Sequence, residues 1–153
     1  MLSTIIYFPI ARLILWASGL LYHFVFVAIT FLGPRGDDET RKVFIDGSGD
    51  RSKDHLTTVF TTTGIAIAVY LLRGFLQSHT LIFFIPLGLA VLHNAFQIIV
   101  FAIQGYICVG ATGSTVRSVF SVVINTVYTL YCLGAEAFIA LKMINIIVPG
   151  ILG

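Results

Sequence analysis

Three polar side chains recur on one face of an otherwise apolar segment, and their types and spacing could do chemistry. His93, Gln97 and Gln104 are separated by four and then seven positions. On a helix that turns about 100° per residue, they form a single stripe. Amides and imidazoles in a membrane helix either hydrogen-bond to a neighbouring helix or line an aqueous path. The stripe therefore indicates a helix-packing seam or a proton path, and both interpretations stay open.

A carboxyl group lies deep in the last apolar segment. Glu136 follows Asn125 and Cys132 on the same helical face. A charge at the centre of a bilayer costs at least about 2.5 kcal/mol, so this group requires a partner or a function. One interpretation is a neutral acid that hydrogen-bonds to a neighbouring helix, and the other is a group that handles protons.

Two features of the sequence bear on cofactor and metal chemistry. His23 and His93 lie near the middle of two apolar segments, so a haem held by two axial imidazoles is an alternative, although we expect no cofactor. The segment Asp46–Asp50 resembles the start of a calcium loop, but Arg51 stands where that loop needs glycine. Bond-making catalysis is not indicated, because the sequence has no nucleophile paired with a base and no phosphate loop.

The composition decides the class of protein that must position these groups. Of 153 residues, 58% are hydrophobic and only 10% are charged, against about 25% charged in a soluble domain. So few charges exclude an ordinary soluble enzyme, and a net charge of +2 gives no footprint for nucleic acid. The sequence predicts an all-α, polytopic integral membrane protein.

The apolar segments predict about four transmembrane helices in a single membrane domain, residues 1–153. We expect these helices at 10–32, 56–77, 81–109 and 118–148. Arg12 stands at the entrance of the first, where a long side chain reaches the headgroups. A 22-residue polar loop over 34–55 holds 11 of the 16 charges. Residues 56–89 are either one tilted helix or a helix followed by a turn.

Two short segments resemble a known family. Gln97, Gln104 and Tyr106 have the spacing of polar and aromatic residues in the last helix of subunit a of F-type ATP synthases. Upstream, Leu72-Arg73 followed by Ser78-His79-Thr80-Leu81 is similar to the preceding helix of that subunit. The resemblance covers residues 72–106.

The resemblance implies a proton-conducting stator in the mitochondrial inner membrane, beside a rotor c-ring. Arg73 would be the stator arginine, facing Gln104 and separating two proton half-channels. A guanidinium suits that role because it stays charged at any membrane pH. The implied proton path includes Gln97, His93, Glu136 and His79. Such a chain has no active site of its own and is at most one subunit of a proton-translocating enzyme.

Other functions fit the same residues. One is a non-catalytic accessory subunit of a mitochondrial ATP synthase or respiratory complex, with lipids and other subunits as partners. Another is a small channel or transporter. The stator interpretation requires Arg73 within reach of Gln104, whereas an accessory subunit would direct Arg73 at a lipid phosphate or a neighbouring subunit.

Overall fold

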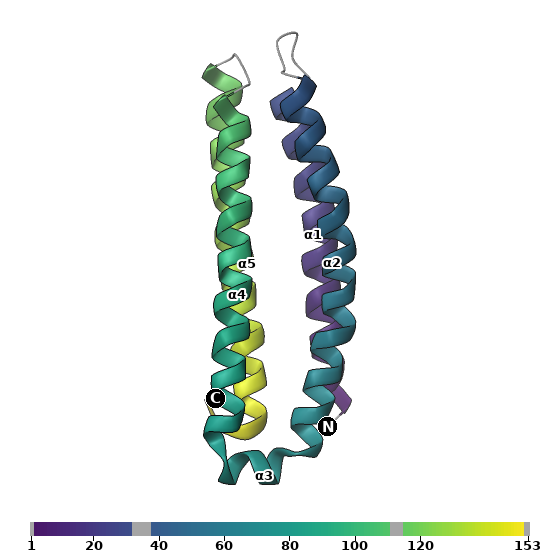
Figure 1. Ribbon diagram of the computed structural model, residues 1–153, viewed down its shortest axis with the longest axis vertical. Coiled ribbons are helices and arrows are strands. Elements are labelled where there is room, and N and C mark those ends of the chain that lie inside the picture. Colours follow the sequence, from purple (N-terminus) through teal and green to yellow (C-terminus); the bar gives the residue numbers. More distant parts are fainter. Residues whose placement is uncertain (1, 32–37, 111–114, 152–153) are drawn as a thin grey trace.

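The chain folds into a long helical bundle (Figure 1). The computed structural model describes residues 2–31, 38–110 and 115–151. Each of their elements is a helix: α1 (Leu2–Phe31), α2 (Asp38–Leu71), α3 (Arg73–Ser78), α4 (Thr80–Gly110) and α5 (Thr115–Ile147). The four long helices run alternately up and down, and the short α3 crosses one end of the bundle.

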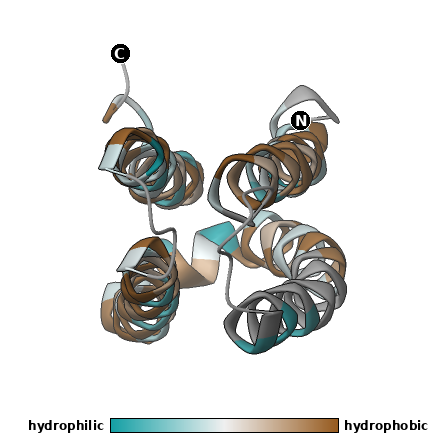
Figure 2. Cartoon of the chain, turned by 90° about the horizontal axis from the view of Figure 1, so that it is seen from above, coloured by the Kyte–Doolittle hydropathy of each residue, from teal (hydrophilic) through white to brown (hydrophobic). Residues whose placement is uncertain are grey.

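The all-α, polytopic membrane prediction is confirmed. Thr4–Thr30, Thr80–Gly110 and Thr115–Ile147 are each long and apolar enough to cross a bilayer, and α2 adds a shorter apolar segment, Leu56–Leu71. Large apolar side chains point outward, among them Phe24 and Phe60, each 74% exposed. Viewed from above, apolar residues predominate on the described helices at the corners of a rough square (Figure 2). Lipid tails suit such an exterior, because they are as apolar as the side chains that face them.

The bundle consists of two hairpins. Helix α1 packs most extensively on α2, and α4 packs most extensively on α5. Contact between the hairpins runs mainly along α1 and α5. We call the end that carries α3 and both chain ends the α3 end, and the opposite end, where α1 and α4 finish, the distal end.

The polar loop predicted for 34–55 is wrong from residue 38 onward, because α2 begins at Asp38. Residues 34–37 of that prediction lie outside the described residues. A run of mixed charges is compatible with either a loop or a solvated helix. Extending an existing helix adds one hydrogen bond for each residue ordered, which favours the helix. Helix α1 likewise begins at Leu2, earlier than the predicted start near residue 10, and includes Pro9.

Residues 56–89 are not one tilted helix. Leu72 leaves the helical conformation, with φ −93° and ψ 7°, and His79 does so again, with φ −128° and ψ 56°. The six residues between them form α3, which carries the chain from the first hairpin to the second. The predicted helix over 56–77 therefore ends earlier, at Leu71.

Candidate functional site

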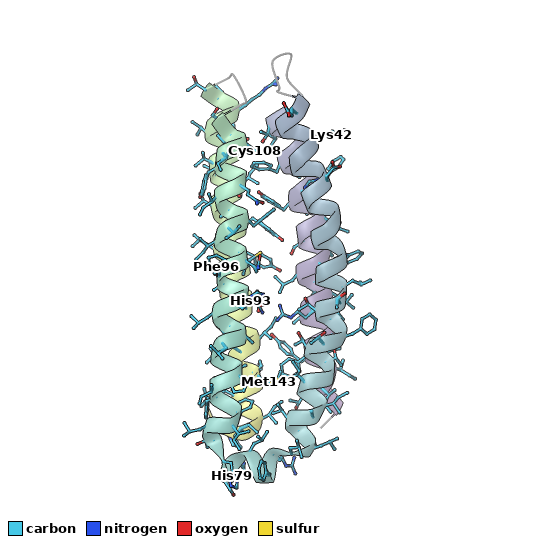
Figure 3. The ribbon with its side chains drawn as sticks, in the orientation of Figure 1. Lys42, His79, His93, Phe96, Cys108 and Met143 are labelled. Atoms are coloured by element: carbon cyan, nitrogen blue, oxygen red, sulfur yellow. The ribbon has the colours of Figure 1, made fainter. Side chains whose placement is uncertain are left out.

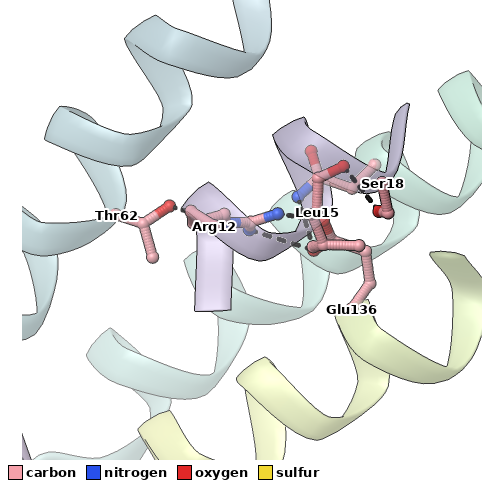
Figure 4. A network of polar contacts seen from close by, with 6 residues as sticks. Arg12, Leu15, Ser18, Thr62 and Glu136 are labelled. Carbon is pink, nitrogen blue, oxygen red and sulfur yellow. Dashed lines mark hydrogen bonds and ion pairs between the residues drawn. The ribbon is translucent and has the colours of Figure 1, made fainter. Parts of the chain in front are cut away.

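One polar side chain from each long helix meets at a single junction in the bundle. Figure 4 shows three of them, Arg12, Thr62 and Glu136. Arg12 of α1 forms a two-pronged ion pair with Glu136 of α5, and its Nη2 donates to Oε2 at 3.0 Å. Arg12 Nε also donates to Thr62 Oγ1 of α2 at 3.1 Å. Asn94 of α4 donates from Nδ2 to Glu136 Oε2 at 3.1 Å. We call these four residues the polar junction.

The polar junction is closed off from its surroundings by the chain itself. The side chains of Arg12 and Glu136 are 8% and 12% exposed. A fork of two parallel N–H donors on a carboxylate is the strongest common geometry for an ion pair, and it requires the ionised acid. The charges of Arg12 and Glu136 therefore cancel each other inside the bundle.

The junction lies near the middle of the spans. Arg12 and Glu136 are each five residues from the midpoints of Thr4–Thr30 and Thr115–Ile147. At 1.5 Å per residue this is about 7.5 Å, well inside a hydrocarbon layer roughly 30 Å thick. Asn94 lies one residue from the midpoint of α4. The pair thus lies within the apolar part of both spans, where an unpaired charge is unfavourable.

This geometry corrects two expectations about charge. Arg12 does not extend to the headgroups, because α1 continues below it to Leu2 and its guanidinium is directed into the bundle. Glu136 is not a neutral acid hydrogen-bonded to one helix, because it faces a permanent cation. With α1 starting at Leu2, Arg12 and Glu136 are oppositely charged residues inside two spans, and opposite charges within two apolar segments were the signal in the sequence that marked both as candidates for an ion pair.

A second buried polar contact joins the hairpins toward the distal end. The Tyr22 hydroxyl of α1 donates to Asn125 Oδ1 of α5 at 2.8 Å, and Asn125 Nδ2 donates to the Ala102 carbonyl of α4 at 2.9 Å. Asn125 is completely buried. Gly105 makes room for it, since a Cβ at Gly105 would lie 2.6 Å from Asn125 Oδ1. The amide thus links three helices.

The inward face of α5 changes character at Glu136. Toward the distal end it continues with Cys132, Asn125 and Ser121, and Ser121 shares a 2.9 Å hydrogen bond with Thr30 of α1. Toward the α3 end its buried residues are apolar: Ile139, Met143, Ile146 and Ile147. Polar contacts therefore connect α1 to α5 from Glu136 to the distal end. Between Glu136 and the α3 end, α5 packs on the other helices through apolar side chains.

The predicted stripe on α4 lies outside the polar junction. His93, Gln97 and Gln104 are all exposed, whereas their neighbour Asn94 turns inward to Glu136. His93 lies about halfway along the bundle (Figure 3). It is two residues from the midpoint of α4, as is Gln97. The chain therefore leaves an imidazole and an amide exposed at mid-membrane depth.

The structure does not bring Arg73 and Gln104 together. Arg73 begins α3 at one end of the bundle, whereas Gln104 lies 24 residues beyond the start of α4 at Thr80. At 1.5 Å per residue this separation is about 36 Å along the bundle. His79 is also at the α3 end, exposed, and stacked on Phe75 with ring centroids 4.4 Å apart.

The structure does not place the two candidate haem ligands opposite each other. His23 lies 11 residues above Arg12 on α1, whereas His93 adjoins Asn94 at the level of the polar junction. The two levels differ by about 16 Å, so the imidazoles do not face each other as axial ligands must. Among the described residues, no group of three or more His, Cys, Asp or Glu side chains is placed to hold a metal ion.

The polar junction can hold the four long helices together and neutralise the charges of Arg12 and Glu136. The polar junction connects the two hairpins, and His93 and Gln97 are polar side chains left exposed near the same level of α4. In comparisons with known proteins, no family model, curated protein or solved structure matches this chain.

Proposed function

We propose that this chain is a non-catalytic transmembrane subunit of a larger membrane complex. The observation that carries the proposal is the exposure of His93 and Gln97 on α4 at mid-membrane depth. A polar group left in hydrocarbon without a partner costs several kcal/mol, and such groups in membrane helices almost always face protein or water. A transmembrane segment of another subunit that lies against α4 would supply the partner.

The finer part of the proposal concerns the host complex. The resemblance of residues 72–106 to subunit a favours an ATP synthase or respiratory complex of the mitochondrial inner membrane. Within such a complex the accessory role is better supported than the stator role, because the stator role requires Arg73 beside Gln104. A channel is less well supported, because the buried polar groups contact other helices of the bundle. Arg12 pairs with Glu136, Asn125 accepts a hydrogen bond from Tyr22, and the side chains of Arg12, Glu136 and Asn125 are at most 12% exposed.

Site-specific photocrosslinking in native membranes tests the proposal. A photoreactive residue at Gln97 is expected to capture one discrete protein partner, and the chain is expected to migrate with a large complex in mild detergent. The matched control is Leu130 of α5, which is 64% exposed and apolar, and we expect it to capture mainly lipid. Crosslinking of Gln97 to lipid alone, with the chain migrating as a monomer, would contradict the proposal.

A further inference from the structure

Helix α3 lies where membrane and water meet. It connects Leu71, at the end of the apolar part of α2, to Thr80, where the next span begins, and it runs across the bundle axis (Figure 1). Leu76 of α3 is 7% exposed, and Gln77 Nε2 donates to the Ile147 carbonyl of α5 at 3.0 Å. These contacts hold α3 flat against the end of the bundle. Because apolar segments end on both sides of it, we infer that α3 lies at the depth of the lipid headgroups.

The outer surface around α3 combines apolar and cationic groups. Leu72 and Phe75 are 54% and 53% exposed, and Arg73 between them is exposed as well. Short segments with apolar side chains beside a cation bind at the boundary between acyl chains and headgroups. The surface thus suits a lipid headgroup with its acyl chains beside it.

The guanidinium of Arg73 is held in a defined position. Its Cζ lies 4.6 Å from the centre of the Tyr70 ring, a cation–π arrangement. Among the described residues Arg73 has no carboxylate partner, in contrast to Arg12. A stacked guanidinium still presents its N–H edge, and that planar fork matches two oxygens of a phosphate.

The charged side chains that the structure describes at the α3 end are basic. All acidic residues of the sequence except Glu136 fall within residues 37–54, and positions 38–54 form the half of α2 that is nearer the distal end. The α3 end carries Arg73 and also Lys142, whose Nζ lies 5.8 Å from the Tyr7 ring centre. A cationic and apolar surface is complementary to the acidic lipids of a membrane leaflet.

We propose that Arg73 binds the phosphate group of an acidic phospholipid in the leaflet at the α3 end. Leu72 and Phe75 contact the acyl chains, and the Tyr70 ring orients the guanidinium. The occupant is a membrane lipid, because the exposed apolar residues on both sides of Arg73 offer nothing to a free phosphate ion. This inference does not depend on a partner subunit.

Native mass spectrometry tests the proposal on the full chain reconstituted in vesicles of phosphatidylcholine mixed with phosphatidylglycerol. After extraction, the wild-type protein should retain phosphatidylglycerol in preference to phosphatidylcholine. Arg73→Gln should lower that preference about fivefold, because one charged phosphate contact contributes about 1 kcal/mol. Tyr70→Leu keeps the charge but removes the supporting ring, and it should lower the preference by a smaller factor. Arg117→Gln is the matched control at the distal end and should behave as wild type.

Two results would overturn the proposal. One is a wild-type protein with no preference for phosphatidylglycerol, or a preference that both Arg73→Gln and Tyr70→Leu leave unchanged. The other is displacement of phosphatidylglycerol by inorganic phosphate at equal concentration, which would mean that the site recognises free phosphate. Neither result concerns the partner proposed for Gln97, so the two proposals succeed or fail separately.

Discussion

Replacement of Glu136 by glutamine is the sharpest test of the polar junction. The change keeps the size of the side chain and removes its charge. Arg12 then remains cationic about 7.5 Å from the middle of its span, with a side chain only 8% exposed. Breaking a buried ion pair by removing one partner typically costs about 3–5 kcal/mol. We expect Glu136→Gln to lower the free energy of unfolding by about that amount.

The double variant separates the ion pair from its surroundings. Arg12→Gln alone should also be strongly destabilising, because it leaves the buried carboxyl of Glu136 without its cationic partner. Arg12→Gln combined with Glu136→Gln removes both charges and retains polar groups that can bond each other. The combined loss should therefore fall short of the sum of the single losses by about 2–3 kcal/mol.

The assay is reversible unfolding by sodium dodecyl sulfate in mixed micelles, followed by the loss of helical circular dichroism. Lys142→Gln is the control for removing a cation elsewhere. Lys142 lies over the Phe138 ring at 5.5 Å, so its loss should cost only about 0.5–1 kcal/mol. The reasoning is refuted if Glu136→Gln costs no more than Lys142→Gln, or if the double variant loses the full sum of the single effects.

Three further predictions use the same unfolding assay. Gly105→Ala should cost about 1–3 kcal/mol, because its Cβ would lie 2.6 Å from the fully buried Asn125, whereas Gly134→Ala has nothing within 4 Å and should be neutral or slightly stabilising. Tyr22→Phe should cost about 1–2 kcal/mol, since it removes the hydroxyl that donates to Asn125 at 2.8 Å; an unchanged stability would refute that role. Gln77→Leu removes the 3.0 Å bond between α3 and α5 and should cost at most about 1.5 kcal/mol, with faster hydrogen exchange confined to α3. Faster exchange throughout the bundle would contradict that local role.

Much of the architecture follows from composition and periodicity. With 58% hydrophobic residues, the chain cannot cover itself with polar surface, and helices satisfy every backbone hydrogen bond inside a membrane. The placement of His93, Gln97 and Gln104 on one face of α4 also follows from helical spacing alone. Spacing does not say whether that face is buried, and the structure shows it exposed.

The helix that begins at Asp38, in the charged stretch after the first span, could not be predicted from the local sequence. Charges predicted solvent contact for residues 34–55, and Glu39, Lys42 and Asp46 are indeed exposed. Solvent contact does not distinguish a loop from a helix. The packing of α2 along α1 supports a helix that begins at Asp38, and that packing depends on both segments together.

The sequence by itself determined that the chain is helical, that it belongs in a membrane, and that Glu136 needs a partner or a function. Only the tertiary structure decided that this partner is Arg12. Arg12 and Glu136 are 124 positions apart, and no local pattern relates them. They meet because α1 and α5 run antiparallel and bring both residues to the same level of the bundle, where the low dielectric strengthens the attraction between the two charges.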